Sequence, residues 1–168
     1  MHRYTNKLEK IGNEKLDPGE TILIGLRAKA AWNISAAIQG GLSGASSGAV
    51  SGASGLPFSG ISTGSSKKEQ ETKLAEQSGF PYPGSMAIAL TNKRLLVWKR
   101  SILFGYLQEY QGDYQINKID SIKLFNEKGL GDRLLIKLTD SHTIRIYAVR
   151  KDGTKDFVEQ LKNLINKT

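Results

Sequence analysis

The sequence predicts a mainly β domain closed by a C-terminal amphipathic helix, and three stretches carry this prediction. Residues 86–99 indicate a β-hairpin, because two apolar runs flank a short polar break at residues 91–94. Residues 134–146 indicate a second hairpin, because apolar and polar side chains alternate on both sides of a break at residues 139–141. Residues 154–167 then carry an apolar stripe at helical spacing: Phe157, Val158, Leu161, Leu164 and Ile165. Because such a stripe must be buried, we expect this helix to pack into a groove between strands.

The N-terminal part of the chain predicts one helix and one strand. Leu8 and Ile11 lie at helical spacing among charged residues, which predicts a short and mostly solvated helix over residues 4–15. An Asp-Pro-Gly turn signal follows at residues 17–19. Residues 21–31 then alternate as a first strand would, with three apolar side chains on one face: Ile22, Ile24 and Leu26.

A long stretch without charge follows the first strand. Residues 30–66 are dominated by Gly, Ser and Ala, and their large apolar residues are too few for an independent core. We therefore expect an insertion between the first and second strands, at residues 32–80. Within it, small residues recur every four positions: Ala36, Gly40, Gly44, Gly48 and Gly52.

This spacing is typical of a glycine-zipper-like helix, so three alternatives remain open for the insertion. It is a flexible loop, or a helix that lies on a membrane or pairs with another copy, or a membrane-spanning helix. Glycine costs about 1 kcal/mol per helical position relative to alanine, and bulky apolar residues are few, so the spanning helix is the least favoured.

The middle of the chain predicts a helix, a break and then strands. Residues 67–77 are strong helix formers with mixed charge, which predicts a short exposed helix. Residues 79–84 contain two prolines and two glycines, and they end this helix before the first hairpin. Residues 101–111 are ambiguous, whereas residues 114–116 and 119–125 predict two short strands.

The first hairpin predicts one buried face and one special turn residue. The large side chains of residues 86–90 fall on one face of the first arm and two alanines on the other, so we expect the large side chains to define a core face. Asn92 tolerates the left-handed backbone conformation that a tight turn requires. We therefore expect Asn92 to shape the turn.

Several stretches together resemble small bacterial domains related to pleckstrin-homology (PH) and GRAM domains. The hairpin looks like their L-T-N/D-x-R-L hairpin at five positions: Leu90, Thr91, Asn92, Arg94 and Leu95. Residues 19–23 (G-E-T-I-L) are similar to their GE-x-I-L opening strand, residues 119–122 (I-D-S-I) to their I-x-x-I strand start, and the closing helix to theirs. The resemblance implies a PH-like fold: a seven-stranded, mostly antiparallel sandwich or open barrel plugged by the C-terminal helix. The expected organisation is an N-terminal helical extension, residues 1–16, and one PH-like domain, residues 17–168, interrupted by the insertion.

Composition argues against catalysis and metal binding. The chain has no cysteine, which excludes disulfides, thiolate zinc sites and cysteine nucleophiles. His2 is terminal, and His142 lies at a predicted turn without a nearby partner, so the two histidines cannot build a usual zinc site. Four aspartates fall at predicted turns or strand ends, where carboxylates are common: Asp113, Asp120, Asp132 and Asp140. We therefore expect a protein that is not an enzyme and that has no cofactor.

The net charge of +8 raises the prospect of an anionic partner, although a basic soluble domain also fits it. In phosphoinositide-binding PH domains, basic side chains on the first two strands hold the head-group phosphates. Arg27 and Lys29 occupy the comparable first-strand region, but the second strand has no basic residue, so we do not expect stereospecific inositide binding. The candidate contacts to anionic lipid flank the insertion or lie in the hairpin turn: Arg27, Lys29, Lys67, Lys68 and Lys93. Arg94 has a structural alternative, because it could pair with a carboxylate.

Two functions from different classes remain open. The first is a binding module that associates peripherally with anionic membrane lipid, and the second is a protein-interaction or self-assembly module without direct lipid binding. Nucleic acid ranks third, because the aromatic residues that could stack bases fit a core better: Trp98, Tyr106 and Tyr110. The first seven residues lack the apolar stretch of a secretory signal, so we expect a cytoplasmic protein, at the inner face of the membrane if the first function holds.

Overall fold

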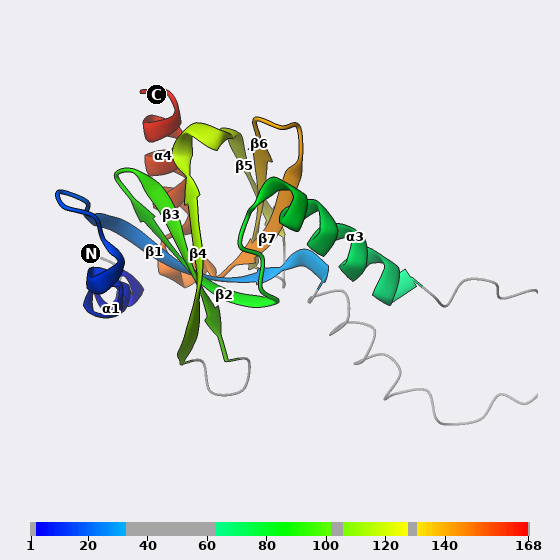
Figure 1. The fold of residues 1–168 in the computed structure, drawn as a ribbon, viewed down its shortest axis with the longest axis horizontal. Coiled ribbons are helices and arrows are strands. Elements are labelled where there is room, and N and C mark those ends of the chain that lie inside the picture. Colours follow the sequence, from blue (N-terminus) through cyan, green and yellow to red (C-terminus); the bar gives the residue numbers. More distant parts are fainter. Residues whose placement is uncertain (1–2, 33–62, 102–105, 128–130, 168) are drawn as a thin grey trace, which may run out of the picture.

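The computed structural model describes residues 3–32, 63–101, 106–127 and 131–167, which form one antiparallel sheet with helices around it (Figure 1). The helices are α1 (Arg3–Gly12), α3 (Thr63–Ser78) and α4 (Thr154–Ile165). The strands are β1 (Ile22–Ala30), β2 (Ser85–Thr91), β3 (Arg94–Arg100), β4 (Leu107–Gln115), β5 (Ile119–Glu127), β6 (Gly131–Leu138) and β7 (Thr143–Ala148). Their order is β4-β3-β2-β1-β7-β6-β5, and all neighbours are antiparallel. The predicted fold class, seven antiparallel strands closed by a C-terminal helix, is confirmed.

Helix α4 buries its apolar stripe in an inner core between the two halves of the bent sheet. Phe157 and Leu161 are 0% exposed and pack among apolar side chains of β1, β2, β3, β6 and β7. The helix begins after Gly153, whose φ of 86° is left-handed and suits glycine. No side chain caps this helix, and the preceding Asp152 instead accepts hydrogen bonds from Arg27.

The first hairpin buries both of its faces: the predicted core face of large side chains is confirmed, and the opposite face is buried as well. The large side chains of β2 face the inner core, while Ala87 and Ala89 face an outer core with Leu96 and Trp98 of β3. Helix α1 covers this outer core (Figure 1). The small alanines leave the room that a helix needs to approach the sheet.

Helix α1 therefore belongs to the folded unit, and the prediction that it is mostly solvated is wrong. Leu8 is 0% exposed and Thr5 is 1% exposed. Among the apolar side chains of α1, only Ile11 is exposed, with 44% of its surface accessible. Gly25 of β1 makes the close packing possible, because a Cβ there would lie 2.5 Å from Leu8 Cδ1. The hydroxyl of Thr5 also accepts a hydrogen bond from the Gly25 N–H at 3.1 Å.

Two local details of the first strand and hairpin differ from the prediction. Ile22 packs in the outer core rather than beside Ile24, because the register of β1 against β2 shifts between these two residues. Such a bulge turns the side chain to the opposite face. Asn92 does not take a left-handed conformation; its side chain accepts from the Thr21 N–H and donates to the Gly19 carbonyl. The turn is held instead by Thr91 Oγ1, which accepts from the Lys93 and Arg94 N–H groups.

The later strands agree with the prediction in part. The second hairpin is confirmed, with β6 and β7 joined through a turn in which Ser141 has a φ of 71°. Residues 114–116 do not form a strand of their own, since β4 runs from Leu107 to Gln115 and its bulges opposite β3 obscure the alternation. The predicted strand at residues 119–125 corresponds to β5.

The insertion is described only at its two ends. Helix α3 confirms the helix predicted over residues 67–77, and most of its described side chains are exposed. Ala75 and the following Phe80 nevertheless reach the inner core. The glycine-spaced residues, Ala36, Gly40, Gly44, Gly48 and Gly52, lie outside the described residues. Within the described part of the chain, no helix is long and apolar enough to cross a membrane.

Candidate anion-binding surface

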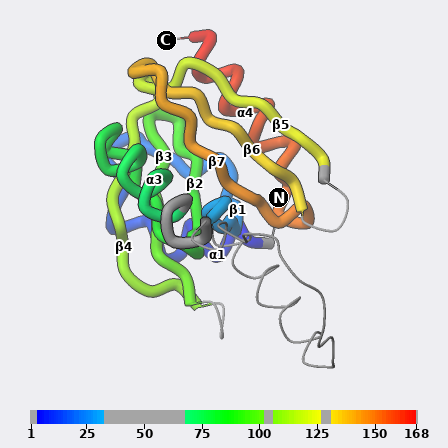
Figure 2. Tube along the Cα trace, turned by 90° about the vertical axis from the view of Figure 1, so that its right-hand side faces the viewer, coloured from blue at the N-terminus to red at the C-terminus, as the bar shows by residue number. Residues whose placement is uncertain are grey.

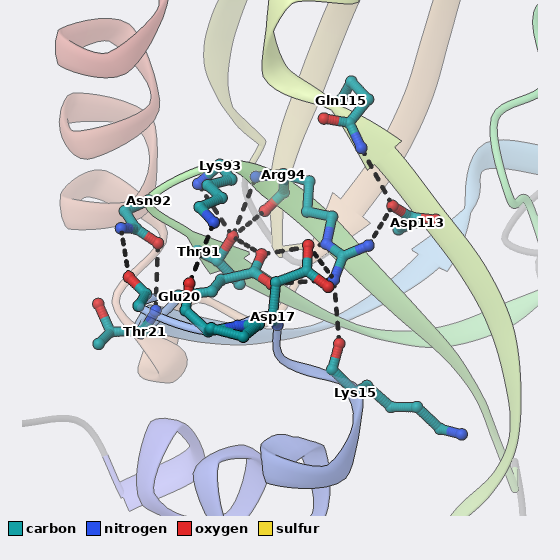
Figure 3. Close-up of polar contacts among 12 residues, drawn as sticks. Lys15, Asp17, Glu20, Thr21, Thr91, Asn92, Lys93, Arg94, Asp113 and Gln115 are labelled. Atoms are coloured by element: carbon teal, nitrogen blue, oxygen red, sulfur yellow. Dashed lines mark hydrogen bonds and ion pairs between the residues drawn. The ribbon is translucent and has the colours of Figure 1, made fainter.

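Polar side chains from the hairpin and from the stretch before β1, two of the stretches that carry the PH-like resemblance, meet in one network with a structural role (Figure 3). Arg94 donates from Nε and Nη2 to Glu20 at 3.1 and 2.9 Å, and from Nη1 to Asp113 Oδ2 at 2.8 Å. Thr91 Oγ1 donates to Glu20 Oε1 at 2.6 Å. The Glu20 side chain is 0% exposed and that of Arg94 is 15% exposed, so these groups pair with each other rather than with a ligand. The structural alternative for Arg94 is confirmed.

The network holds Glu20 ionised. Burial opposes the ionisation of this carboxyl, but the hydrogen bonds from Arg94, the Asp17 N–H and Thr91 outweigh burial and lower its pKa from 4.5 to about 2. The same bonds raise the pKa of Arg94. Because Glu20 precedes β1 and Arg94 begins β3, the network fastens the start of the sheet to the hairpin turn.

Arg27 makes a second structural pair. Its Nε and Nη2 donate to the two oxygens of Asp152, both at 2.7 Å, and its backbone N–H donates to Oδ2 at 2.9 Å. Asp152 is 4% exposed, whereas the Arg27 side chain is 32% exposed and lies over the Tyr4 ring. The pair joins β1 to the start of α4, so Arg27 has a structural partner.

The other candidate lysines do not form one cluster. Lys29 is exposed near the end of β1, and Lys68 is exposed on α3 with its Nζ 5.0 Å from the centre of the Trp32 ring. Lys67 lies in α3, but its side chain is outside what the structure describes. Lys93 lies at the other end of β1, since Ile22 pairs with Thr91 and Lys29 pairs with Ser85. At about 3.3 Å per residue, the two ends are about 23 Å apart.

The acidic residues and His142 have structural partners that the sequence did not reveal. Asp132 is 2% exposed and pairs with Arg150 at 2.9 Å. Nδ1 of His142 lies 3.0 Å from Asp140 Oδ2, so the prediction that His142 has no nearby partner is wrong. The hydrogen bond from His142 lowers the pKa of Asp140. Among the described residues, no group of three or more His, Asp or Glu side chains could hold a metal ion.

Sequence reasoning missed a basic and aromatic face on the outer side of β5, β6 and β7, which we call the outer β5–β7 face. Directly paired residues share one face of a sheet, and the register places Phe125 beside Arg133, Arg133 beside Tyr147 and Tyr147 beside Lys29. The next rows add further outward residues: Lys123, Leu135, Lys137 and Arg145. The alternation of apolar and polar residues in β6 and β7 indicated that these side chains point outward. Only the strand order shows that they lie next to one another.

A groove borders the outer β5–β7 face where α3 passes beside β7. Its volume is about 340 Å³, and its lining includes Trp32 and Leu74 on one side and Arg133, Arg145 and Tyr147 on the other. The Nε1 atom of Trp32 is buried and has no hydrogen-bond partner among the described residues. The Tyr82 hydroxyl holds the two sides of the groove together, because it forms hydrogen bonds with Glu71 of α3, with the Arg145 carbonyl of β7 and with the Ala31 N–H. Figure 2 shows α3 on the β7 side and β5 at the far edge.

The aromatic residues first considered for base stacking are mostly in the core. Trp98 is 3% exposed, and Tyr110 packs against it with ring centres 5.4 Å apart. Tyr106 is 52% exposed at the start of β4.

No protein-family model matches the sequence, and no curated protein matches it. Among solved structures, the C-terminal domain of an unknown protein from Leishmania infantum aligns over 95% of this chain and 97% of its own, with 11% identity and a TM-score of 0.43. A DUF1696 family protein with a pleckstrin-homology domain from Shewanella loihica aligns over 56% of this chain and 92% of its own, with 12% identity and a TM-score of 0.38. Likenesses with such low identities and TM-scores carry no argument about the function of this chain.

Proposed function

We propose that the protein is a non-enzymatic binding module that associates peripherally with anionic membrane lipid at the insertion-bearing end of the sheet. The observation that carries this proposal is the position of Lys29, Lys68 and Trp32. They lie where the chain leaves β1 and returns in α3, and both lysines are exposed. Indole rings prefer the membrane interface, and each lysine near an acidic leaflet contributes about 1 kcal/mol.

The described contacts narrow the set of lipid-contacting residues. Arg27 supports this end by holding β1 to α4 through Asp152, so we assign it a structural role beside the lysines. Lys93 lies at the opposite end of β1 and would not reach the same surface. Lys67 precedes Lys68 in α3 and adds charge at the same end. The attraction is therefore electrostatic and does not depend on head-group stereochemistry.

Vesicle co-sedimentation tests the proposal. The full chain should sediment with vesicles of phosphatidylserine and phosphatidylcholine and remain in the supernatant with phosphatidylcholine alone. The triple substitution Lys29→Ala, Lys67→Ala and Lys68→Ala should weaken the attachment at least tenfold, since three cations are lost. A matched triple of exposed lysines elsewhere, Lys10→Ala, Lys93→Ala and Lys155→Ala, should keep most of it.

Attachment that survives both the first triple and high salt would refute an electrostatic anchor at this end. If no vesicle of either composition binds the chain, the membrane role fails, and the protein-interaction or self-assembly module becomes the better explanation. Sedimentation equilibrium of the same sample would then show whether the partner is a second copy.

A further inference from the structure

We propose that the outer β5–β7 face binds single-stranded nucleic acid, with one base in the groove beside α3 and a neighbouring base on Phe125. This inference goes beyond the membrane proposal and shares only Lys29 and Trp32 with it. It rests on the pairing of flat rings with cations along one continuous sheet surface. Single-stranded nucleic acids are held by this combination, because bases stack on aromatic rings while phosphates bind cations.

Aromatic rings and cations alternate across four strands of this face. Phe125 keeps 40% of its surface exposed on the edge strand β5, and the Arg133 guanidinium lies 5.1 Å from its ring centre. Tyr147 follows on β7 and Lys29 on β1 in the same cross-strand row. With neighbouring strands about 4.8 Å apart, the row is about 14 Å long, which suits two or three nucleotides.

The groove at one side of this row has the size and chemistry to hold one base. Its volume of about 340 Å³ is within the range of small-molecule sites. Trp32 and Tyr147 both contribute aromatic surface to its lining, and a base could stack on it. Arg145 is exposed at the same groove, where it could meet the phosphate.

The charge of the face is complementary to a phosphate backbone. Lys123 and Arg145 are exposed on the row next to Phe125 and Tyr147. Two nearby carboxylates are already engaged, because Asp120 pairs with Lys137 at 3.0 Å and Glu71 accepts from the Tyr82 hydroxyl. A membrane surface would use the cations equally well, but the alternation of rings and cations along one row also matches the alternation of bases and phosphates along a strand, so the observations favour nucleic acid.

Fluorescence anisotropy of the full chain with a labelled 12-mer of oligouridylate tests this inference. The oligonucleotide should bind, and a duplex of the same length should bind at least tenfold more weakly, because paired bases cannot reach the rings. Phe125→Ala should weaken binding about tenfold, and Phe125→Tyr should retain it, since the tyrosine ring still stacks. The double substitution Lys123→Ala and Arg145→Ala should reduce the slope of log affinity against log salt by about 1.4, as expected for two lost phosphate contacts.

Matched controls separate this site from general basicity and from the membrane proposal. The double substitution Lys10→Ala and Lys155→Ala removes the same charge from α1 and α4 and should change oligonucleotide affinity by less than twofold. Phe125→Ala should leave sedimentation with phosphatidylserine vesicles unchanged. Equal binding of duplex and single strand, an unchanged affinity of Phe125→Ala, or equal losses in both double variants would each overturn the inference.

Discussion

Arg94 ties three separate parts of the chain together with one guanidinium. It contacts Glu20 before β1, Asp113 in β4 and the carbonyl of Lys15 after α1 (Figure 3). A planar fork with several donors can satisfy such a set of acceptors at once, whereas a lysine ammonium cannot. The L-T-N-x-R-L stretch of this chain therefore stabilises the fold. A ligand-binding surface must be sought in other residues.

The first prediction concerns the loss of this guanidinium. Arg94→Ala leaves the fully buried Glu20 carboxylate without its main partner, so the free energy of unfolding should fall by about 3 kcal/mol or more. Urea denaturation followed by circular dichroism measures it. The adjacent Lys93→Ala is the matched control, because Lys93 is exposed and its loss should cost less than about 0.5 kcal/mol. Equal effects of the two substitutions would contradict the structural role of Arg94.

The second prediction concerns acid stability. The pKa of Glu20 is about 2 in the folded chain and 4.5 as its ordinary value, so its stabilising contribution is complete above pH 4.5 and is lost as the pH falls towards 2. That contribution is about 3 kcal/mol. Urea unfolding at pH 6, 5, 4 and 3 should therefore show a steep decline in wild type that is reduced in Glu20→Gln. A parallel decline in both proteins would show that other groups control acid unfolding.

At the scale of single elements, α1 and α4 seal the two faces of the same sheet. Helix α4 was predictable, because five apolar residues at helical spacing form a stripe that faces a core. The docking of α1 was not, because its own apolar residues are few and the complementary surface is made of alanines and a glycine on other strands. Small residues that create room for a helix give no periodic signal of their own.

The third prediction tests whether α1 is part of the folded unit. Leu8→Ala should lower the free energy of unfolding by about 2–4 kcal/mol, since it opens a cavity in the outer core beside Trp98. Ile11→Ala, one turn away and 44% exposed, should change it by less than about 1 kcal/mol. If the two variants unfold at the same urea concentration, α1 does not contribute to the core.

The fourth prediction concerns α4. Leu161→Asp places an unpaired charge at a fully buried position of the inner core and should destabilise the fold by several kcal/mol. Lys162→Asp, at the next and exposed position, introduces the same carboxylate where water can solvate it. Thermal unfolding compares the two variants. A similar melting temperature for both would contradict the burial of α4 in the inner core.

At the scale of the whole molecule, the fold could be predicted far better than the site. Strand patterns, hairpins and the closing helix follow from local periodicity. The candidate cations could be named but not placed, because only the strand order shows that Lys93 and Lys29 lie at opposite ends of β1 and that Arg27 is committed to Asp152. The outer β5–β7 face likewise depends on the pairing of three strands, which no single stretch encodes.

The fifth prediction is that residues 35–62 are dispensable for folding. This range is dominated by Gly, Ser and Ala and carries few large apolar side chains for a core. A short Gly-Ser linker between Trp32 and α3 should suffice, because Lys68 of α3 already lies over the Trp32 ring, and shortening a loop changes its closure cost little. Differential scanning calorimetry should give one cooperative transition near the wild-type temperature; loss of that transition would place the segment in the core.

The most direct test of membrane association uses the two tryptophans of the chain. Trp98 lies in the outer core, so Trp98→Phe leaves Trp32 as the sole reporter at the insertion-bearing end. When this variant is mixed with phosphatidylserine vesicles at low salt, the Trp32 emission should shift to shorter wavelength and become protected from acrylamide. High salt should reverse both effects by screening the lysines. Sedimentation of the protein with those vesicles while the Trp32 emission stays unchanged would contradict attachment through this end.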